Sequence, residues 1–131
     1  MLYVIKNGFN GVPVTPEADF VYCVTNIQEI LRCRLDWCFT DGHAVEKFSY
    51  PYSESDLDNI ENIVDFKAVN IKNWKDENDL DLKRRKEAEF LVANDIPASA
   101  IKGFVVYNED AKAAIALLTQ KPVVVRQEYY F

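Results

Sequence analysis

Short apolar and aromatic stretches alternate along the chain with polar stretches that contain glycine, proline, asparagine or aspartate. Runs rich in β-branched and aromatic residues predict strands at 2–6, 20–24, 37–40, 86–92, 103–107 and 122–126. Apolar residues at helical spacing predict helices that begin after Thr25 or Asn26, after Ser55 and after Asn108, with brief helical segments at 43–48 and 97–101. Because the strands mix apolar with polar positions and alternate irregularly with helices, we expect an α+β fold with a mixed or antiparallel sheet.

Two segments lack a regular period. Residues 50–52, with a central proline, predict a turn. Residues 65–81 predict a long mobile loop that holds Trp74 among charged residues. Loops of this length in compact domains are usually functional or disordered.

The composition is that of a soluble globular protein. The chain has 131 residues, 49% of them apolar and 27% charged, so we expect one domain over residues 1–131. A net charge of −6 argues against a protein that coats nucleic acid nonspecifically, although a local basic patch stays compatible with it. The sequence has no apolar run of membrane-spanning length and no signal-peptide pattern, so we expect a cytoplasmic protein without a membrane partner.

The candidate metal ligands are few. Cys23, Cys33 and Cys38 are odd in number and lack Cys-x-x-Cys spacing, which predicts three reduced, buried thiols. His43 is the only histidine, so we expect no metal site.

The most informative segment is Lys-Arg-Arg-Lys-Glu-Ala-Glu-Phe-Leu-Val at 83–92. As a strand, it places Glu87 and Glu89 on one face beside four positive charges. A carboxylate fixed in a cleft can stabilise a developing positive charge or act as a general base. The alternative is a solvent-exposed edge on which the adjacent cations neutralise both glutamates, and spacing alone favours it. The basic run is likewise either solvated or a phosphate-contacting patch.

This segment resembles the signature of DarT, the DNA ADP-ribosyltransferase toxins, in which a basic run precedes Ala-Glu-Phe-Leu-Val. Other stretches resemble the family in the same order along the chain. They are Met-Leu-Tyr-Val-Ile at 1–5, Trp-Cys-Phe-Thr-Asp-Gly-His-Ala at 37–44, Asn-Trp-Lys-Asp at 73–76 and Ile-Lys-Gly-Phe-Val-Val-Tyr at 101–107. The resemblance runs over nearly the whole chain, and its collinearity is more specific than any single motif. It reverses the preference for an exposed edge at Glu89.

The resemblance implies an ADP-ribosyltransferase fold, a split mixed sheet around a nicotinamide cleft. It also implies transfer of ADP-ribose from NAD to a base in single-stranded DNA, and a macrodomain antitoxin as a partner. Glu89 would be the catalytic carboxylate, which binds the nicotinamide-ribose hydroxyl and assists the attacking base, whereas Glu87 carries over no role. The DNA side would use Trp74, in a substrate-recognition loop at 65–83, to stack on a base. Lys83, Arg84 and Arg85 would lie near DNA phosphates.

The sequence also departs from the family. DarT proteins place a His-Phe-Thr-type segment and an arginine, which grip NAD, before the Met-Leu-Tyr stretch with which this sequence begins. We therefore expect an N-terminally truncated domain with weak NAD binding and weak or no activity, and we assign no NAD-binding residue besides Glu89. Two alternatives stay open. One is a catalytically dead remnant or a module that binds nucleic acid or an antitoxin, and the other is an unrelated α+β protein with Glu89 buried away from any cleft.

Overall fold

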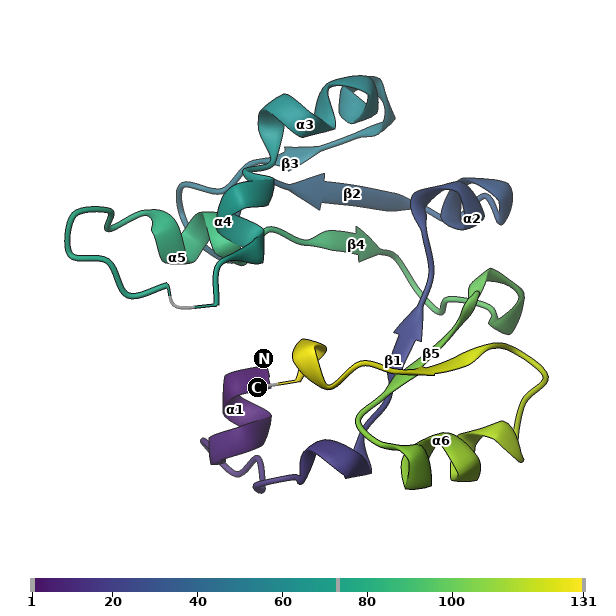
Figure 1. The fold of residues 1–131 in the computed structure, drawn as a ribbon. Coiled ribbons are helices and arrows are strands. Elements are labelled where there is room, and N and C mark those ends of the chain that lie inside the picture. The colour runs from purple at the N-terminus through teal and green to yellow at the C-terminus, as the bar shows by residue number, and fades with distance from the viewer. Residues whose placement is uncertain (1, 73, 131) are drawn as a thin grey trace. The chain divides into compact units, whose positions relative to one another are not determined.

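The computed structural model describes residues 2–72 and 74–130 (Figure 1). The motif residues Met1 and Asn73, and the terminal Phe131, lie outside the described residues. The α-helices are α1 (Leu2–Asn7), α2 (Ile27–Arg32), α3 (Ile60–Ile63), α4 (Phe66–Asn70), α5 (Leu82–Lys86) and α6 (Glu109–Ala116). The strands are β1 (Tyr22–Val24), β2 (Trp37–Thr40), β3 (Pro51–Tyr52), β4 (Phe90–Val92), β5 (Gly103–Val106) and β6 (Val123–Val125). Short 3-10 turns are η1 (Glu17–Asp19), η2 (Glu54–Asn59), η3 (Ala98–Ala100) and η4 (Gln127–Tyr129).

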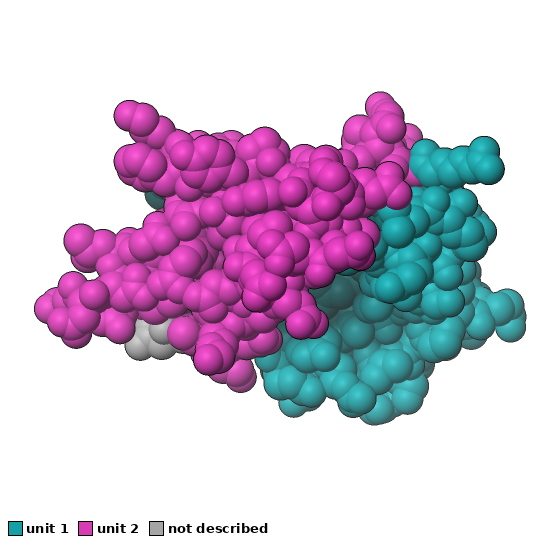
Figure 2. All heavy atoms as spheres, turned by 90° about the horizontal axis from the view of Figure 1, so that it is seen from above, with its two compact units in different colours: residues 1–34, 96–131 teal, residues 35–95 magenta. Residues whose placement is uncertain are grey.

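The chain divides into two compact units, which Figure 2 distinguishes by colour. One consists of residues 1–34 and 96–131, and the other of residues 35–95. In the first unit the sheet has the strand order β1-β5-β6, with β1 antiparallel to β5 and β5 parallel to β6. Helix α6 connects the two parallel strands, because a parallel pair requires a crossover. The sheet is mixed, as the sequence predicted.

Asparagine side chains cap two helices of this unit at the predicted positions. Asn26 and Asn108 each accept a hydrogen bond from the backbone N–H three residues later, at 2.9 Å and 2.8 Å. The helical segment predicted to begin after Ser55 begins instead after Ser53, which forms a capping box with Asp56. Local capping signals were therefore readable from the sequence to within about two residues.

An aromatic cluster packs around Tyr130 in the first unit. The ring centroids of Phe20, Tyr22 and Tyr107 lie 5.0, 4.9 and 5.5 Å from that of Tyr130. Tyr130 is 3% exposed, and its hydroxyl donates a hydrogen bond to the carbonyl of Val105 at 2.9 Å. Burial raises the pKa of the Tyr130 hydroxyl. The cluster thus fastens the C-terminal segment to β5.

The second unit is built on β2, which lies between β3 and β4 and is antiparallel to both. Phe39 on β2 is 1% exposed and stacks on Tyr52, with ring centroids 5.3 Å apart. Trp37 stacks on Phe90 at 5.0 Å. These contacts fix β4 beside β2, and the segment that enters β4 carries the candidate site.

The structure differs from the prediction at the basic run. The strand predicted over 86–92 is limited to β4, and the four consecutive cations lie in helix α5. Lysine and arginine have high helix propensity, and positive charge near a helix C-terminus interacts favourably with the helix dipole. The placement of Glu87 and Glu89 on one strand face was therefore wrong, since neither residue lies in a strand.

Other differences are local. The strand predicted at 2–6 is helix α1, which ends at Asn7 and is followed by Gly8 with φ +71°. An apolar run this short has no periodicity that separates strand from helix. Residues 43–48 form successive turns rather than a helix, the turn predicted at 50–52 contributes β3, and the loop predicted at 65–81 contains α4.

The cysteine prediction was correct only for the oxidation state. The three cysteines are free, but Cys23 is exposed and both Cys33 and Cys38 are half-buried. Cys23 lies on β1, an edge strand whose alternate side chains face away from the core. The prediction of three buried thiols was wrong.

Candidate active site

The backbone of Glu89 pairs with Thr40 at the end of β2. The Thr40 N–H donates to the Glu89 carbonyl at 2.9 Å, and the Glu89 N–H donates to Thr40 Oγ1 at 3.1 Å. Thr40 is 3% exposed, and its own hydroxyl donates to the carbonyl of Gly42 at 2.6 Å. The candidate carboxylate is therefore anchored to a rigid sheet, which keeps a functional side chain in place.

The carboxylate of Glu89 is half-buried and held at one oxygen. The N–H of Ala44 donates to Oε2 at 2.8 Å. Among the residues that the structure describes, none donates to the other oxygen, Oε1, which can therefore accept a hydrogen bond from a ligand hydroxyl. A carboxylate held in this way can bind a sugar hydroxyl and stabilise positive charge on the adjacent carbon. A ribose hydroxyl is a donor of the kind that Oε1 can accept from.

Arg84 on α5 holds the turn that carries Ala44. Its carbonyl accepts a hydrogen bond from the His43 N–H at 3.0 Å, and its Nη1 lies 3.3 Å from a carboxylate oxygen of Asp41. A Cβ at Gly42 would come within 2.5 Å of Arg84 Nη1 and 2.9 Å of the Arg84 carbonyl oxygen. The glycine of the Thr-Asp-Gly motif is thus required by the close approach of Arg84.

Carboxylates of the loop before α5 pair with its guanidinium groups. Asp81 accepts hydrogen bonds from Arg84 Nε and Nη2 at 2.7 and 2.9 Å. Arg85 forms ion pairs with Asp65 and Asp79, and its Nε lies 3.2 Å from Asp81. The hydrogen bond between Arg84 and Asp81 lowers the pKa of the Asp81 carboxyl and raises that of Arg84. Both guanidiniums, which the resemblance would place near DNA phosphates, therefore have acidic partners within the chain.

The other predicted DNA-side residues have different surroundings. Lys83 is exposed, and it forms no ion pair with any residue in the described ranges. Trp74 is half-buried in the loop before α5. The neighbouring Lys86 donates from Nζ to the carbonyls of Val69, at 3.2 Å, and Ile71. The sequence alone did not indicate these loop contacts of α5, because the acids and carbonyls involved lie up to twenty residues away from it.

Sequence reasoning missed the partners of Glu89. It singled out Glu89 but neither the Thr40 hydroxyl, which accepts from the Glu89 backbone N–H, nor the Ala44 N–H, which donates to the Glu89 carboxylate. The signal that could have found them is the threonine at the end of a predicted strand, followed directly by Asp-Gly. A hydroxyl at that place can turn back onto the backbone of a neighbouring strand.

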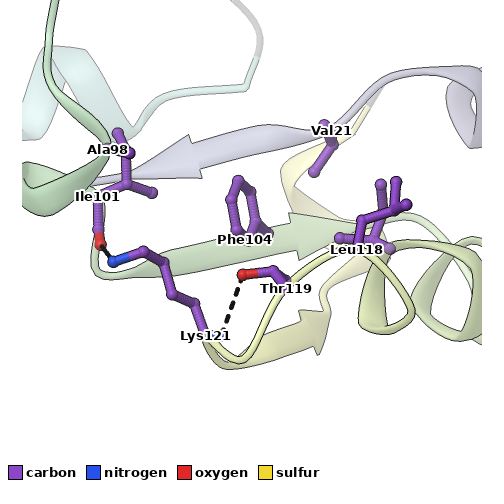
Figure 3. Close-up of a pocket in the computed structure, with 8 residues that line it drawn as sticks. Val21, Ala98, Ile101, Phe104, Leu118, Thr119 and Lys121 are labelled. Carbon is purple, nitrogen blue, oxygen red and sulfur yellow. Dashed lines mark hydrogen bonds between the residues drawn. The ribbon is translucent and has the colours of Figure 1, made fainter.

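A cavity in the first unit lies apart from these residues along the chain. It encloses about 280 Å³ beside β1, β5 and the end of α6, with Val21, Phe104 and Leu118 among its apolar lining residues (Figure 3). At its edge Lys121 Nζ donates to the carbonyl of Ile101 at 2.6 Å. Neither Glu89 nor any of the predicted DNA-side residues lines it.

The described residues contain neither a metal-binding cluster nor a membrane-spanning helix. No group of three or more His, Cys, Asp or Glu side chains among them is arranged to hold a metal ion. No helix in the described part of the chain is long and apolar enough to cross a bilayer.

The site can now be set beside known proteins. Residues 1–131 match the family described as ssDNA thymidine ADP-ribosyltransferase, DarT. The chain belongs to the DarT family. A curated relative from Mycobacterium tuberculosis, a DNA ADP-ribosyl transferase, is 26% identical over 119 residues, which cover 90% of this chain and 50% of that protein. The chain therefore spans about half the length of the curated DarT relatives from the mycobacteria that it matches.

Solved DarT structures share the fold. Thermus sp. 2.9 DarT in complex with NAD+ superposes with a TM-score of 0.79 at 23% identity, over 99% of this chain and 66% of that one. The complex of the same protein with ADP-ribosylated ssDNA gives a TM-score of 0.82 at 22% identity, over 99% and 63% of the two chains. The predicted ADP-ribosyltransferase fold is confirmed.

Proposed function

We propose that this DarT chain transfers ADP-ribose from NAD to a base in single-stranded DNA, with Glu89 as the catalytic carboxylate. The observation that carries the proposal is the geometry of Glu89. One carboxylate oxygen is held by the N–H of Ala44 at 2.8 Å, and the other is open to a ligand. Membership of the DarT family and the NAD+ and ssDNA complexes of its Thermus member support the choice of substrates.

The proposed chemistry needs one carboxylate in two roles. NAD supplies the ADP-ribosyl group at the carbon bonded to nicotinamide. Glu89 Oε1 accepts a hydrogen bond from a hydroxyl of that ribose, and its charge stabilises the positive charge that develops as the bond to nicotinamide breaks. The electron pair of the broken bond leaves with nicotinamide, a nucleophilic atom of the base forms the new bond, and Glu89 takes up the proton that the base loses.

The DNA side of the proposal uses residues around α5. Trp74 stacks on an unpaired base, and the exposed ammonium of Lys83 contacts a phosphate. Arg84 and Arg85 lie beside Lys83 on the same helix, but a phosphate would have to compete with their carboxylate partners.

The proposal also covers the domain organisation of the chain, its compartment and its protein partner. It treats residues 1–131 as one domain, since the family match runs through both compact units. NAD and single-stranded DNA are substrates found in the cytoplasm, and a macrodomain antitoxin is the partner that the family resemblance implies.

The proposal is tested by incubating the chain, in molar excess, with labelled NAD and single-stranded oligonucleotides of one base each. We expect label in the thymidine strand, the base that the family description names, and none in duplex DNA. Glu89→Ala should lower labelling by at least about 100-fold, the usual contribution of a general base. Unchanged labelling by Glu89→Ala would contradict the proposal.

A second result separates the proposal from its alternative. Binding of single-stranded DNA without any transfer would favour a binding module or inactive remnant. Calorimetric titration with NAD adds an independent measurement, because a dissociation constant in the micromolar range would contradict the weak NAD binding expected from the sequence.

A further inference from the structure

Two consecutive backbone amides link Arg84 to Glu89. The N–H of His43 donates to the Arg84 carbonyl at 3.0 Å, and the next N–H along the chain, that of Ala44, donates to Glu89 Oε2 at 2.8 Å. If the backbone at His43 shifts relative to α5, the direction of the Ala44 N–H, which holds the Glu89 carboxylate, therefore changes.

The side chain of Arg84 holds the same turn from a second direction. Its Nη1 faces Asp41 at 3.3 Å and Ser49 Oγ at 3.4 Å, while Nε and Nη2 face Asp81. Asp41 in turn accepts a hydrogen bond from the Tyr50 N–H at 2.9 Å, which closes the loop that begins at the turn. The Arg84 side chain is 16% exposed, and each nitrogen of its guanidinium faces a protein acceptor.

We propose that Arg84 is a positioning residue of the site, which holds the turn at 41–44 so that the N–H of Ala44 fixes the Glu89 carboxylate. This inference rests on the proposed function of Glu89. It differs from the phosphate contact that the basic run suggests, because a phosphate would have to compete with Asp41, Ser49 and Asp81 for the Arg84 donors. The absence of a side chain at Gly42 is what allows Arg84 to approach so closely.

Charge-conserving substitution separates the two roles. Lysine keeps the positive charge, but its single ammonium cannot bridge Asp41 and Asp81 as the guanidinium fork does. A phosphate contact would be largely retained in Arg84→Lys, whereas the hold on the turn would be lost in both Arg84→Lys and Arg84→Gln. Asp41→Asn weakens the same contact from its other partner without changing Arg84.

The first measurement needs no activity. Hydrogen exchange of individual amides is followed by NMR in the unmodified chain, Arg84→Lys, Arg84→Gln and Asp41→Asn. We expect exchange of the Ala44 amide to accelerate by about tenfold or more in each variant, because a local opening becomes easier. The Ala93 amide, which donates to Asp36 in the same unit, should keep its rate and so report an intact fold.

A matched control is Arg32→Gln. Arg32 pairs with Glu29 three residues before it, as Arg84 pairs with Asp81, but it lies in the other unit. Its loss should leave exchange at Ala44 unchanged. Unchanged exchange at Ala44 in the Arg84 variants would overturn the inference, even if the unmodified chain transfers ADP-ribose.

The second measurement is kinetic. We expect both Arg84 variants to lower kcat by about tenfold to a hundredfold, with the KM for single-stranded DNA and its salt dependence unchanged. A phosphate contact predicts the opposite: rescue by lysine, and a raised KM and a salt slope smaller by about 0.7 in Arg84→Gln. That pattern overturns the inference. No transfer by the unmodified chain would overturn the proposed function and the catalytic consequence together, while the exchange data alone decide whether Arg84 holds the turn.

Discussion

At the scale of single residues, the structure explains why Glu89 and Glu87 differ although they are two positions apart. Glu89 has Thr40 on its backbone and Ala44 on its carboxylate, whereas Glu87 ends helix α5. The sequence pattern treated the two as equivalent on a strand face. Only the family resemblance separated them, because the partners of Glu89 lie more than forty residues away in the sequence.

Thr40→Val tests the anchor of Glu89. The substitution keeps the shape but removes the hydroxyl that accepts from the Glu89 N–H and donates to Gly42. Leaving these buried groups unpaired should cost about 2 kcal/mol in the free energy of unfolding, measured with urea. Thr40→Ser keeps the hydroxyl and should lose much less. A loss in Thr40→Val no larger than that in Thr40→Ser would contradict the importance of these hydrogen bonds.

At the scale of elements, α5 is where local pattern and structure disagree most. A basic run before an apolar stretch predicted one strand, but the chain forms a helix, a short connection and then β4. The helix becomes favourable because Arg85 pairs with Asp79 in the preceding loop and with Asp65 at the start of α4. Asp65 lies twenty residues away, so a local sequence window cannot contain this tertiary interaction. Such ion pairs place carboxylates next to both Arg84 and Arg85, which the family resemblance would place near DNA phosphates.

Acid pH should loosen the loop before α5. The backbone N–H of Ala68 lowers the pKa of Asp65, and the side chain of Arg84 lowers that of Asp81, both from an ordinary value of 3.8. As pH falls below about 3.8 the unfolded chain takes up these protons first, so the stability they contribute is lost. The free energy of unfolding should fall less steeply between pH 5 and pH 3 in Asp65→Asn and Asp81→Asn than in the unmodified chain. Identical pH slopes in urea titrations would refute this.

The cap of α6 gives a prediction with a built-in control. Asn108→Ala removes the acceptor of the Ala111 N–H and should lower the free energy of unfolding by about 1 kcal/mol. Asn108→Asp keeps an acceptor and adds a favourable charge at the helix N-terminus, so it should retain stability. Chemical denaturation followed by circular dichroism measures both. A loss in the aspartate variant as large as in the alanine variant would contradict the capping account.

At the scale of the whole molecule, the class of fold was predictable but the strand pairings were not. Irregular alternation of short strands and helices indicated α+β, and the sheets confirm it. The pairing of β1 with β5 joins segments about eighty residues apart, and their order is set by packing rather than by local propensity. The candidate site also depends on contacts between distant segments, since Glu89 and the turn at 41–44 come from separate parts of the second unit.

The aromatic cluster of the first unit allows a test of such long-range packing. Tyr130→Ala removes the ring that contacts Phe20, Tyr22 and Tyr107, and it should cost about 3–5 kcal/mol in unfolding free energy. Tyr130→Phe keeps the ring but loses the hydrogen bond to Val105, so we expect a loss of about 1 kcal/mol. Thermal and urea unfolding give both values. A phenylalanine variant as unstable as the alanine variant would show that the hydroxyl dominates.

Glu89 is the one carboxylate that the proposed transfer requires. The most direct measurement is mass spectrometry of a single-stranded thymidine oligonucleotide after incubation with NAD and one protein. That protein is the unmodified chain, the Glu89→Gln variant or the Glu87→Gln variant. We predict that the unmodified chain and Glu87→Gln add one ADP-ribosyl group, and that Glu89→Gln does so at least about 100-fold more slowly. Addition of ADP-ribose by Glu89→Gln at the unmodified rate would contradict the account.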